Sequence, residues 1–254
     1  MASKLSILNI AAYHFAEIQN PEAVRDTLAQ RGEQLELLGT ILVTPEGLNA
    51  FLAGPEAGVH AMLGELRSIP GFSTLQAKES WSDSPPFKKL KVKLKREIIR
   101  MDHPTIRPAE GRAPAVDAQT LARWLDQGHD DQGRPVVMLD TRNDFEVDVG
   151  AFDDAIDWRI QKFTQFPDAV RTHADSLKGK TVVSYCTGGI RCEKAAIFMH
   201  DLGLTNVLQL EGGILKYFEE TDGRHYHGSC FVFDERRALD PSLQPTPLRV
   251  PSSS

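Results

Sequence analysis

The stretch YCTGGIRC, from Tyr185 to Cys192, decides how the fold of this chain is interpreted. Its first two residues close the apolar run TVVSYC, Thr181 to Cys186, which has the composition of a buried strand. In an open parallel α/β sheet, chemistry gathers at the carboxyl ends of the strands. We therefore expect Cys186 at a strand end and a helix starting near Cys192. The tight loop between them would be formed by Thr187, Gly188, Gly189, Ile190 and Arg191.

The two cysteines admit four interpretations. A metal site requires thiolates paired at CxxC spacing and two further ligands, which the sequence does not offer. A Cys186–Cys192 disulfide is conceivable but would fill the loop, and an incidental glycine turn leaves the cysteine, the glycines and Arg191 together unexplained. The pattern favours a reactive thiolate at Cys186. Inward N–H groups, a helix N-terminus and Arg191 would all stabilise its charge.

The spacing between the cysteine and the arginine narrows the chemistry. Cysteine phosphatases place five residues between the two, so that the loop encloses a phosphate, whereas four separate Cys186 from Arg191. The smaller loop is sized for a sulfane sulfur or a similar small group on Cys186. Cys192 is interpreted as structural, with a resolving thiol as the alternative.

Around this loop, apolar strands alternate with helices, which predicts a parallel sheet covered on both faces. Asp140 and Arg142 end the neighbouring strand, beside the loop. Arg142 would position the loop, bind a substrate phosphate, or pair with an acidic neighbour such as Asp144 or Glu146. The expected strands are Pro135–Arg142, Thr181–Cys186 and Asn206–Gly213, and the expected helices are Asp117–Gln127, Phe163–Leu177, Glu193–Leu202 and Ile214–Glu220.

The first hundred residues read as β-α-β-β-α-β, the split βαβ plan of ferredoxin-like domains. A strand at Leu5–Phe15, a helix at Pro21–Leu35 capped by Asn20, a hairpin at Leu37–Gly54, a helix at Pro55–Ile69 and a strand at Phe87–Ile99 make up this plan, and Gly71–Trp81 could hold an extra strand. Prolines make 101–115 a linker. The predicted domains are 1–100, the linker, 116–222, and an extension with a loosely ordered tail from Asp240 at 223–254.

The predicted strand FKKLKVKLKREI is basic. Its lysines alternate with apolar residues, which would place them on one face. One interpretation is an edge strand protected from aggregation; the other is a phosphate-binding stripe for RNA, with Phe87 and Trp81 as stacking groups. The residues of the stripe are Lys88, Lys89, Lys91, Lys93, Lys95 and Arg96.

Composition limits the alternatives. The net charge of −6 argues against bulk binding to nucleic acid such as DNA, but residues 1–115 carry +1 and the remainder −7, so RNA would meet the first half. Three cysteines do not make a disulfide framework, and there is no signal peptide or membrane span, which predicts a cytoplasmic protein. His225, His227 and Cys230 could supply part of a metal site, but a surface turn is favoured and no metal is assigned.

Several segments in order resemble one family. YCTGGIRCEKAA, LDTRNDFEVDVGAF (Leu139 to Phe152) and LEGGILKYFEE (Leu210 to Glu220) are similar to rhodanese domains. Together with TPEGLNAFLAG, the basic strand and GSCFVFDER (Gly228 to Arg236), they resemble the rhodanese-domain tRNA uridine hydroxylases, also labelled UPF0176 proteins, from about Leu5 to Arg237.

The resemblance implies a ferredoxin-like domain that holds tRNA and a rhodanese domain that supplies the nucleophile. It implies oxygen-dependent hydroxylation of C5 of the wobble uridine in the anticodon, with Cys186 as the reactive cysteine. Molecular oxygen and an unidentified reductant are implied as well, although no cofactor motif is evident. The residues alone predict thiolate or persulfide chemistry, so a sulfurtransferase working through a Cys186 persulfide is the alternative. A non-catalytic RNA-binding protein is a third.

Overall fold

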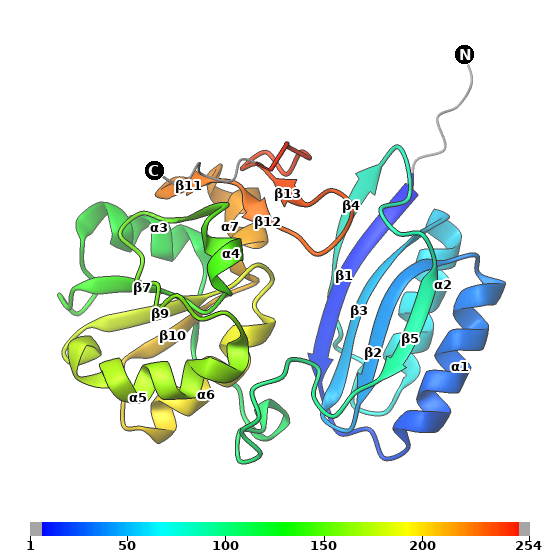
Figure 1. Cartoon of the computed structure of the whole chain (residues 1–254), viewed down its shortest axis with the longest axis horizontal. Coiled ribbons are helices and arrows are strands. Elements are labelled where there is room, and N and C mark those ends of the chain that lie inside the picture. Colours follow the sequence, from blue (N-terminus) through cyan, green and yellow to red (C-terminus); the bar gives the residue numbers. More distant parts are fainter. Residues whose placement is uncertain (1–6, 249–254) are drawn as a thin grey trace. The chain divides into compact units, whose positions relative to one another are not determined.

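The computed structural model describes residues 7–248 and separates into two compact units after Arg100 (Figure 1). Each unit has its own sheet and its own hydrophobic core. Within the described part of the chain, no helix is both long and apolar enough to cross a membrane.

The first unit is a five-stranded sheet with two helices. Its sheet order is β4-β1-β3-β2-β5, in which β1, β3, β2 and β4 pair antiparallel and β5 lies parallel to β2. The elements are β1 (Ile7–Phe15), α1 (Pro21–Gln34), β2 (Leu38–Thr44), β3 (Gly47–Gly54), α2 (Glu56–Ser68), β4 (Ala77–Ser82) and β5 (Leu90–Leu94).

The order of the first four strands is that of a ferredoxin-like domain, but the strand that completes it is not the expected one. The prediction used the basic strand at Phe87–Ile99 as the last element of the plan. Instead β4, which overlaps the stretch Gly71–Trp81, pairs with β1. The basic segment forms only the short β5, added beside β2 at the other edge. Strand β4 (AKESWS) lies at the edge of the sheet, and none of its residues is fully buried. Its sequence therefore carries little apolar periodicity.

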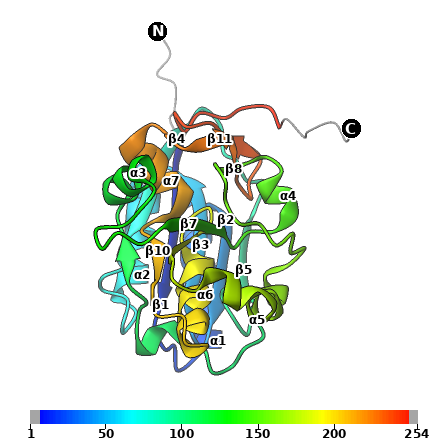
Figure 2. The ribbon, with the colours of Figure 1, turned by 90° about the vertical axis from the view of Figure 1, so that its left-hand side faces the viewer.

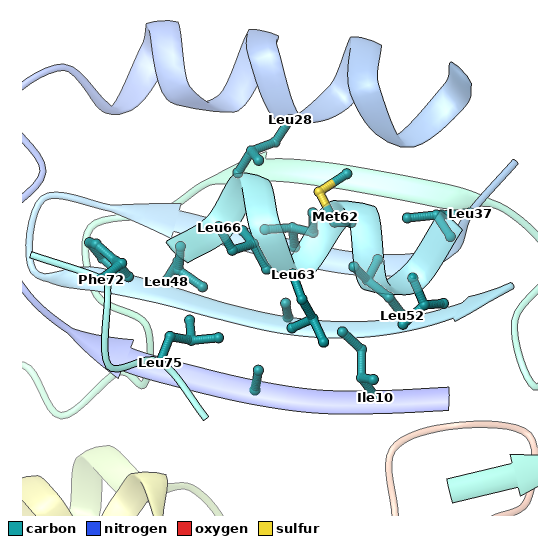
Figure 3. Packing of buried hydrophobic residues seen from close by; sticks show 14 of the residues in the cluster. Ile10, Leu28, Leu37, Leu48, Leu52, Met62, Leu63, Leu66, Phe72 and Leu75 are labelled. Carbon is teal, nitrogen blue, oxygen red and sulfur yellow. The ribbon is translucent and has the colours of Figure 1, made fainter. Parts of the chain in front are cut away.

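Local signals in this unit act as predicted. The Asn20 side chain accepts a hydrogen bond from Ala23 N at 3.1 Å, and Pro21 opens the helix. In the β2–β3 hairpin, Gly47 has a φ of 148°, and a Cβ there would lie 2.2 Å from the His14 carbonyl oxygen on β1. Only glycine fits this close approach. Both helices pack on one face of the sheet, where leucines of the strands meet Met62 and Leu66 of α2 (Figure 3).

The second unit is built around a parallel sheet in the order β6-β10-β9-β7. Helices α3 and α7 cover one face and α5 and α6 the other (Figures 1 and 2). The bounds are β6 (Ala115–Val116), α3 (Ala118–Gln127), β7 (Val136–Asp140), α5 (Phe166–Leu177), β9 (Thr181–Tyr185), α6 (Ile190–Asp201), β10 (Val207–Leu210) and α7 (Gly213–Thr221).

Smaller elements complete this unit. The helix α4 (Asp144–Val147) and the strand β8 (Gly150–Phe152) follow β7, and short 3₁₀ turns occupy Pro108–Glu110 and Phe163–Gln165. After α7 the chain returns as β11 (Tyr226–Gly228), which pairs with β8, and as β12 (Cys230–Phe231), which pairs with β13 (Ala238–Leu239).

Two expectations about this unit are corrected. Helix α6 begins at Ile190 rather than near Cys192, so Arg191 and Cys192 lie in its first turn. The tail beyond Asp240 was expected to be loose. However, the Asp240 carboxylate accepts hydrogen bonds from Ser242 N and Gln244 N, and Thr246 N donates to Ala238 O at 3.0 Å. Residues 249–254 of that tail, and Leu5 and Ser6 of the first predicted strand, lie outside the described residues.

Candidate active site

Cys186 lies where the sequence predicted it, directly after an inner strand of the parallel sheet. Strand β9 runs between β10 and β7 and ends at Tyr185. The cysteine side chain has no exposed surface. Because the flanking strands run in the same direction, the ends of β7 and β10 are brought to the same edge of the sheet.

The loop after Cys186 turns backbone N–H groups toward the sulfur. Gly189 adopts a φ of 100°, a left-handed conformation that L side chains rarely take, and its N–H donates to Cys186 Sγ at 3.1 Å. Gly189 also caps α6, so the sulfur lies at the N-terminus of a 12-residue helix. The partial positive charge of that terminus favours an anion at this position.

The beginning of α7 fixes this loop from behind. Ile214 N donates to Cys186 O at 3.0 Å, and Leu215 N donates to Thr187 O at 3.2 Å. A Cβ at Gly213 would lie 2.4 Å from Cys186 O, so the position needs glycine. With the carbonyl groups held by α7, the loop is free to direct N–H groups at the sulfur.

The pKa values of Cys186 and Cys192 are shifted in opposite directions. Burial by itself would raise the pKa of Cys186. The hydrogen bond from Cys192, the charge of Arg191 and the backbone N–H groups of Arg191 and Gly189 outweigh burial and lower the pKa to about 5. Burial and the neighbouring Cys186 charge raise the pKa of Cys192 well above its usual value. At neutral pH, Cys186 is therefore the thiolate and Cys192 keeps its proton.

Arg191 is held by Glu146, and the sequence did not reveal this pairing. Its Nη1 and Nη2 contact the two carboxylate oxygens of Glu146 at 2.6 and 2.7 Å, and Glu146 also accepts from Asn143 N at 3.1 Å. Glu146 is fully buried in α4 and Arg191 is 5% exposed. Among the described residues, Arg191 Nε is buried without a hydrogen-bond partner.

Of the three roles predicted for Arg142, phosphate binding is wrong, the ion pair has another acidic partner than the two named, and positioning of the loop stays a prediction. Arg142 is fully buried, so it does not reach a substrate phosphate, and its ion-pair partner is Asp140 rather than Asp144 or Glu146. Arg142 Nη2 contacts Asp140 Oδ2 at 2.6 Å and donates to Gly150 O at 2.7 Å. The pair thus ties the end of β7 to β8. Thr141 between them, which the sequence analysis did not single out, donates from Oγ1 to Tyr185 O at 2.8 Å and lies 3.8 Å from Cys192 Sγ.

The histidines and Cys230 near the C-terminus do not converge. His225 contacts Asp126 at 2.7 Å, His227 contacts Asp153 at 3.0 Å, and Cys230 is buried in the core of the unit. Burial raises the pKa of Cys230 to about 12. Across residues 7–248, no group of three or more such side chains is arranged to hold a metal ion. The strand of Cys230 instead reaches the active-site loop, because Thr187 Oγ1 donates to Phe231 O at 3.4 Å.

The basic segment lies in the other unit, at the edge of its sheet. Lys91 and Lys93 are opposite Thr40 and Leu42 of β2, on the face away from α1 and α2. The six predicted RNA-binding residues, Lys88, Lys89, Lys91, Lys93, Lys95 and Arg96, are all exposed. Being an edge strand, β5 also meets the structural condition for protection against aggregation.

The expected stacking partner Trp81 does not share that face. It is opposite Leu8, whose side chain is in the core under the helices, and β4 is at the other edge of the sheet. The aromatic residues that do share the lysine face are Phe51 on β3 and Tyr13 and Phe15 on β1. Phe51 is opposite Thr40, and Thr40 is opposite Lys91. Strand alternation could have revealed this face if the register had been known.

Comparison with known proteins identifies both units. The rhodanese-like domain model matches residues 117–220, which contain the parallel sheet and the Cys186 loop, so the second unit is a rhodanese-class domain. The model of the UPF0176 acylphosphatase-like domain matches residues 7–98, the first unit. The order of the two domains is the one expected from the sequence.

Relatives extend this identification over nearly the whole chain. A protein of Delftia acidovorans named tRNA uridine(34) hydroxylase is 66% identical over 95% of this chain and 92% of its own length. A protein of Bordetella avium with the same name is 63% identical over 95% of this chain and 100% of its own length. The chain belongs to the tRNA uridine(34) hydroxylase family. Among solved structures, a rhodanese-like domain from Anabaena is 22% identical and covers 45% of this chain and 79% of its own, with a TM-score of 0.36.

Proposed function

We propose that this protein hydroxylates C5 of uridine 34, in the anticodon of tRNA, and that Cys186 is its nucleophile. The observation that carries the mechanism is the setting of the Cys186 sulfur, which follows β9 and accepts a hydrogen bond from Gly189 N at 3.1 Å. This hydrogen bond, together with Cys192 and the buried Arg191, lowers the pKa of the thiol to about 5. The relatives named tRNA uridine(34) hydroxylase, which match nearly end to end, supply the substrate and the reaction.

A thiolate suits chemistry on a uracil ring. C6 of uracil is electrophilic because the C5=C6 double bond is conjugated with the C4 carbonyl. Attack by Cys186 forms a C6–S bond, and the electron pair of the opened double bond moves to C5 and O4. C5 then becomes the nucleophilic carbon that the hydroxylation requires. Loss of the C5 proton and departure of the thiolate restore the ring after oxygen has been attached at C5.

The other residues support this step. Arg191 is held rigid by Glu146 and offers its Nε–H to the oxygen on which negative charge develops. Gly189 N and the proton of Cys192 stabilise the departing thiolate. In the net reaction, uridine, dioxygen, two electrons and two protons give 5-hydroxyuridine and water. A two-electron reductant must therefore act with the protein.

The substitution Cys186→Ala tests the assignment. Transfer RNA from cells that contain only this variant should lack 5-hydroxyuridine and its derivatives in nucleoside analysis by mass spectrometry. Cys230→Ala is the matched control, because that cysteine is a buried thiol with a raised pKa, and it should retain the modification. Modification retained by Cys186→Ala would refute the role of Cys186.

The same thiolate would also carry a persulfide, which keeps a sulfurtransferase as the second candidate. The four-residue spacing to Arg191 leaves room for one added sulfur. The tRNA of a deletion strain separates the two functions. If the protein is a sulfurtransferase, that tRNA should keep its normal content of 5-hydroxyuridine.

For binding the tRNA, we assign the lysine face of the first unit, which combines exposed lysines on β5 with Phe51 on β3. Lysines neutralise phosphates and aromatic rings stack on unpaired bases. This assignment agrees with the charge balance, since the acidic excess lies outside the first 115 residues.

A further inference from the structure

Three phenylalanines form one cluster on the surface of the rhodanese unit. Phe145 belongs to α4, Phe231 to β12, and Phe233 follows β12. Their ring centroids lie 5.2 Å (Phe145–Phe231), 5.1 Å (Phe231–Phe233) and 6.4 Å (Phe145–Phe233) apart, with nearly perpendicular planes. Phe145 is nevertheless 43% exposed and Phe233 61% exposed. We call these three residues the phenylalanine cluster.

Such exposure indicates a binding surface. Only five large apolar side chains in the described part of the chain are exposed, and two of them belong to this cluster. Edge-to-face contacts hold the rings in place, so their outer faces are presented in fixed orientations. Exposed aromatic side chains that gather in one place on a folded unit favour a site of interaction.

The cluster is attached to the active-site loop from two sides. Phe145 directly precedes Glu146, whose carboxylate holds Arg191. On the other side, the Phe231 carbonyl accepts the hydrogen bond of Thr187, the residue after Cys186. The fully buried Cys230 anchors β12 in the core next to Phe231. The cluster therefore continues the surface around the cysteine loop.

We propose that the phenylalanine cluster stacks on a nucleobase next to the target uridine in the RNA loop. This inference rests on the proposed function. A base must leave its stack before a buried sulfur can reach its ring, and its neighbours then lose a stacking partner. An exposed aromatic face replaces that partner without requiring charge or a particular base. The cluster is thus a subsite for the flanking nucleotide, separate from the lysine face of the first unit.

The test uses binding of the full-length protein to an anticodon stem-loop RNA. Phe233→Ala should weaken binding about 5- to 150-fold, the range typical for the loss of one stacked base. Phe233→Trp keeps an aromatic face and should bind like the parent. Leu202→Ala removes another exposed apolar side chain, 41% exposed at the opposite end of α6, and should have no effect.

A second RNA identifies the contact as stacking. In this RNA one nucleotide beside uridine 34 is abasic, and each flanking position is tested in turn. When the stacked nucleotide is abasic, the parent should bind the RNA more weakly than it binds the intact RNA. Phe233→Ala should bind this abasic RNA as it binds the intact RNA. Equal binding of parent and Phe233→Ala to the intact RNA would overturn the proposal. The proposal would also be overturned if Phe233→Ala bound both abasic RNAs more weakly than the parent by the same factor as the intact RNA. That result would indicate a different partner for the cluster.

These outcomes are independent of the chemistry. The pH midpoint of Cys186 alkylation should be the same in Phe233→Ala and in the parent, because the ring does not contact the sulfur. Absence of 5-hydroxyuridine formation by the parent would refute the proposed function while leaving the binding result as measured.

Discussion

The thiolate of Cys186 depends on a neighbour that keeps its proton. Cys192 donates its proton toward Cys186, and a hydrogen bond to a charged group contributes about 1.5–3 kcal/mol. This corresponds to about one to two pKa units. We therefore treat Cys192 as a positioning residue rather than as a merely structural one.

Cys192→Ala should accordingly raise the pKa of Cys186 by about one to two units. The pKa is measured as the pH midpoint of iodoacetamide alkylation, followed at Cys186 by peptide mapping. Cys230→Ala removes the other buried thiol, which does not contribute to the lowered pKa of Cys186, and should leave the midpoint in place. An unchanged midpoint in Cys192→Ala would show that the glycine loop and Arg191 suffice.

Glu146 is the counter-charge of the buried Arg191 guanidinium. Glu146→Gln leaves the buried Arg191 guanidinium without its counter-charge, and breaking such a pair typically costs about 3–5 kcal/mol. The measurement is denaturant unfolding of the variant beside Asp168→Asn. Asp168 pairs with Arg171 at the surface, so this control should unfold like the parent. Equal stability of Glu146→Gln would contradict the described geometry.

At the residue scale, the sequence predicted the position of Cys186 at a strand end but not the residues that support it. Cys186, Gly189 and Arg191 lie within a few positions of one another, so their chemistry could be inferred from spacing. Glu146 lies 45 positions before Arg191, and the two meet only because α4 and α6 adjoin the same sheet edge. No local pattern encodes that pairing, and Arg142 was open to three roles for the same reason.

At the scale of elements, the parallel sheet and the hairpin could be predicted because buried strands and tight turns have strong local signals. Edge strands do not, and both errors in the first unit concern them. Strand β4 has no apolar run, while β5 has a conspicuous alternation that matched the missing strand. The face shared by Lys91, Thr40 and Phe51 follows from strand register, which the sequence does not define.

The lysine face makes a prediction at this scale. Replacing Lys89, Lys91 and Lys93 with glutamate should weaken tRNA binding and flatten its dependence on salt, because each lost phosphate contact lowers the slope by about 0.7 to 0.9. The triple arginine variant keeps the charge and serves as the control. Unchanged affinity in the glutamate variant would mean that these lysines only protect the edge of the sheet.

At the scale of the whole molecule, the lowered pKa of Cys186 links stability to pH. An unfolded cysteine has a pKa near 8.5, whereas that of Cys186 is about 5. Between these values the unfolded chain binds one more proton than the folded chain, so stability rises with pH by about 1.4 kcal/mol per unit. The contribution is complete above the unfolded pKa and is lost as the pH falls through the folded one.

The stability difference between the parent and Cys186→Ala should therefore shift in favour of the parent from pH 5.5 to pH 8. Denaturant unfolding at several pH values measures it, and the comparison cancels groups common to both proteins. A difference that does not vary with pH would mean that Cys186 is protonated in the folded protein.

The first unit has a positively charged sheet face with aromatic side chains, and the second unit has a single ionised sulfur. The proposed function depends on the ionised sulfur of Cys186. The direct measurement is the rate of Cys186 alkylation by iodoacetamide across pH in the unmodified protein. Burial slows the reaction at every pH but does not set its midpoint. The account predicts a midpoint near 5; a midpoint between 8 and 9, as for a free cysteine, would contradict it.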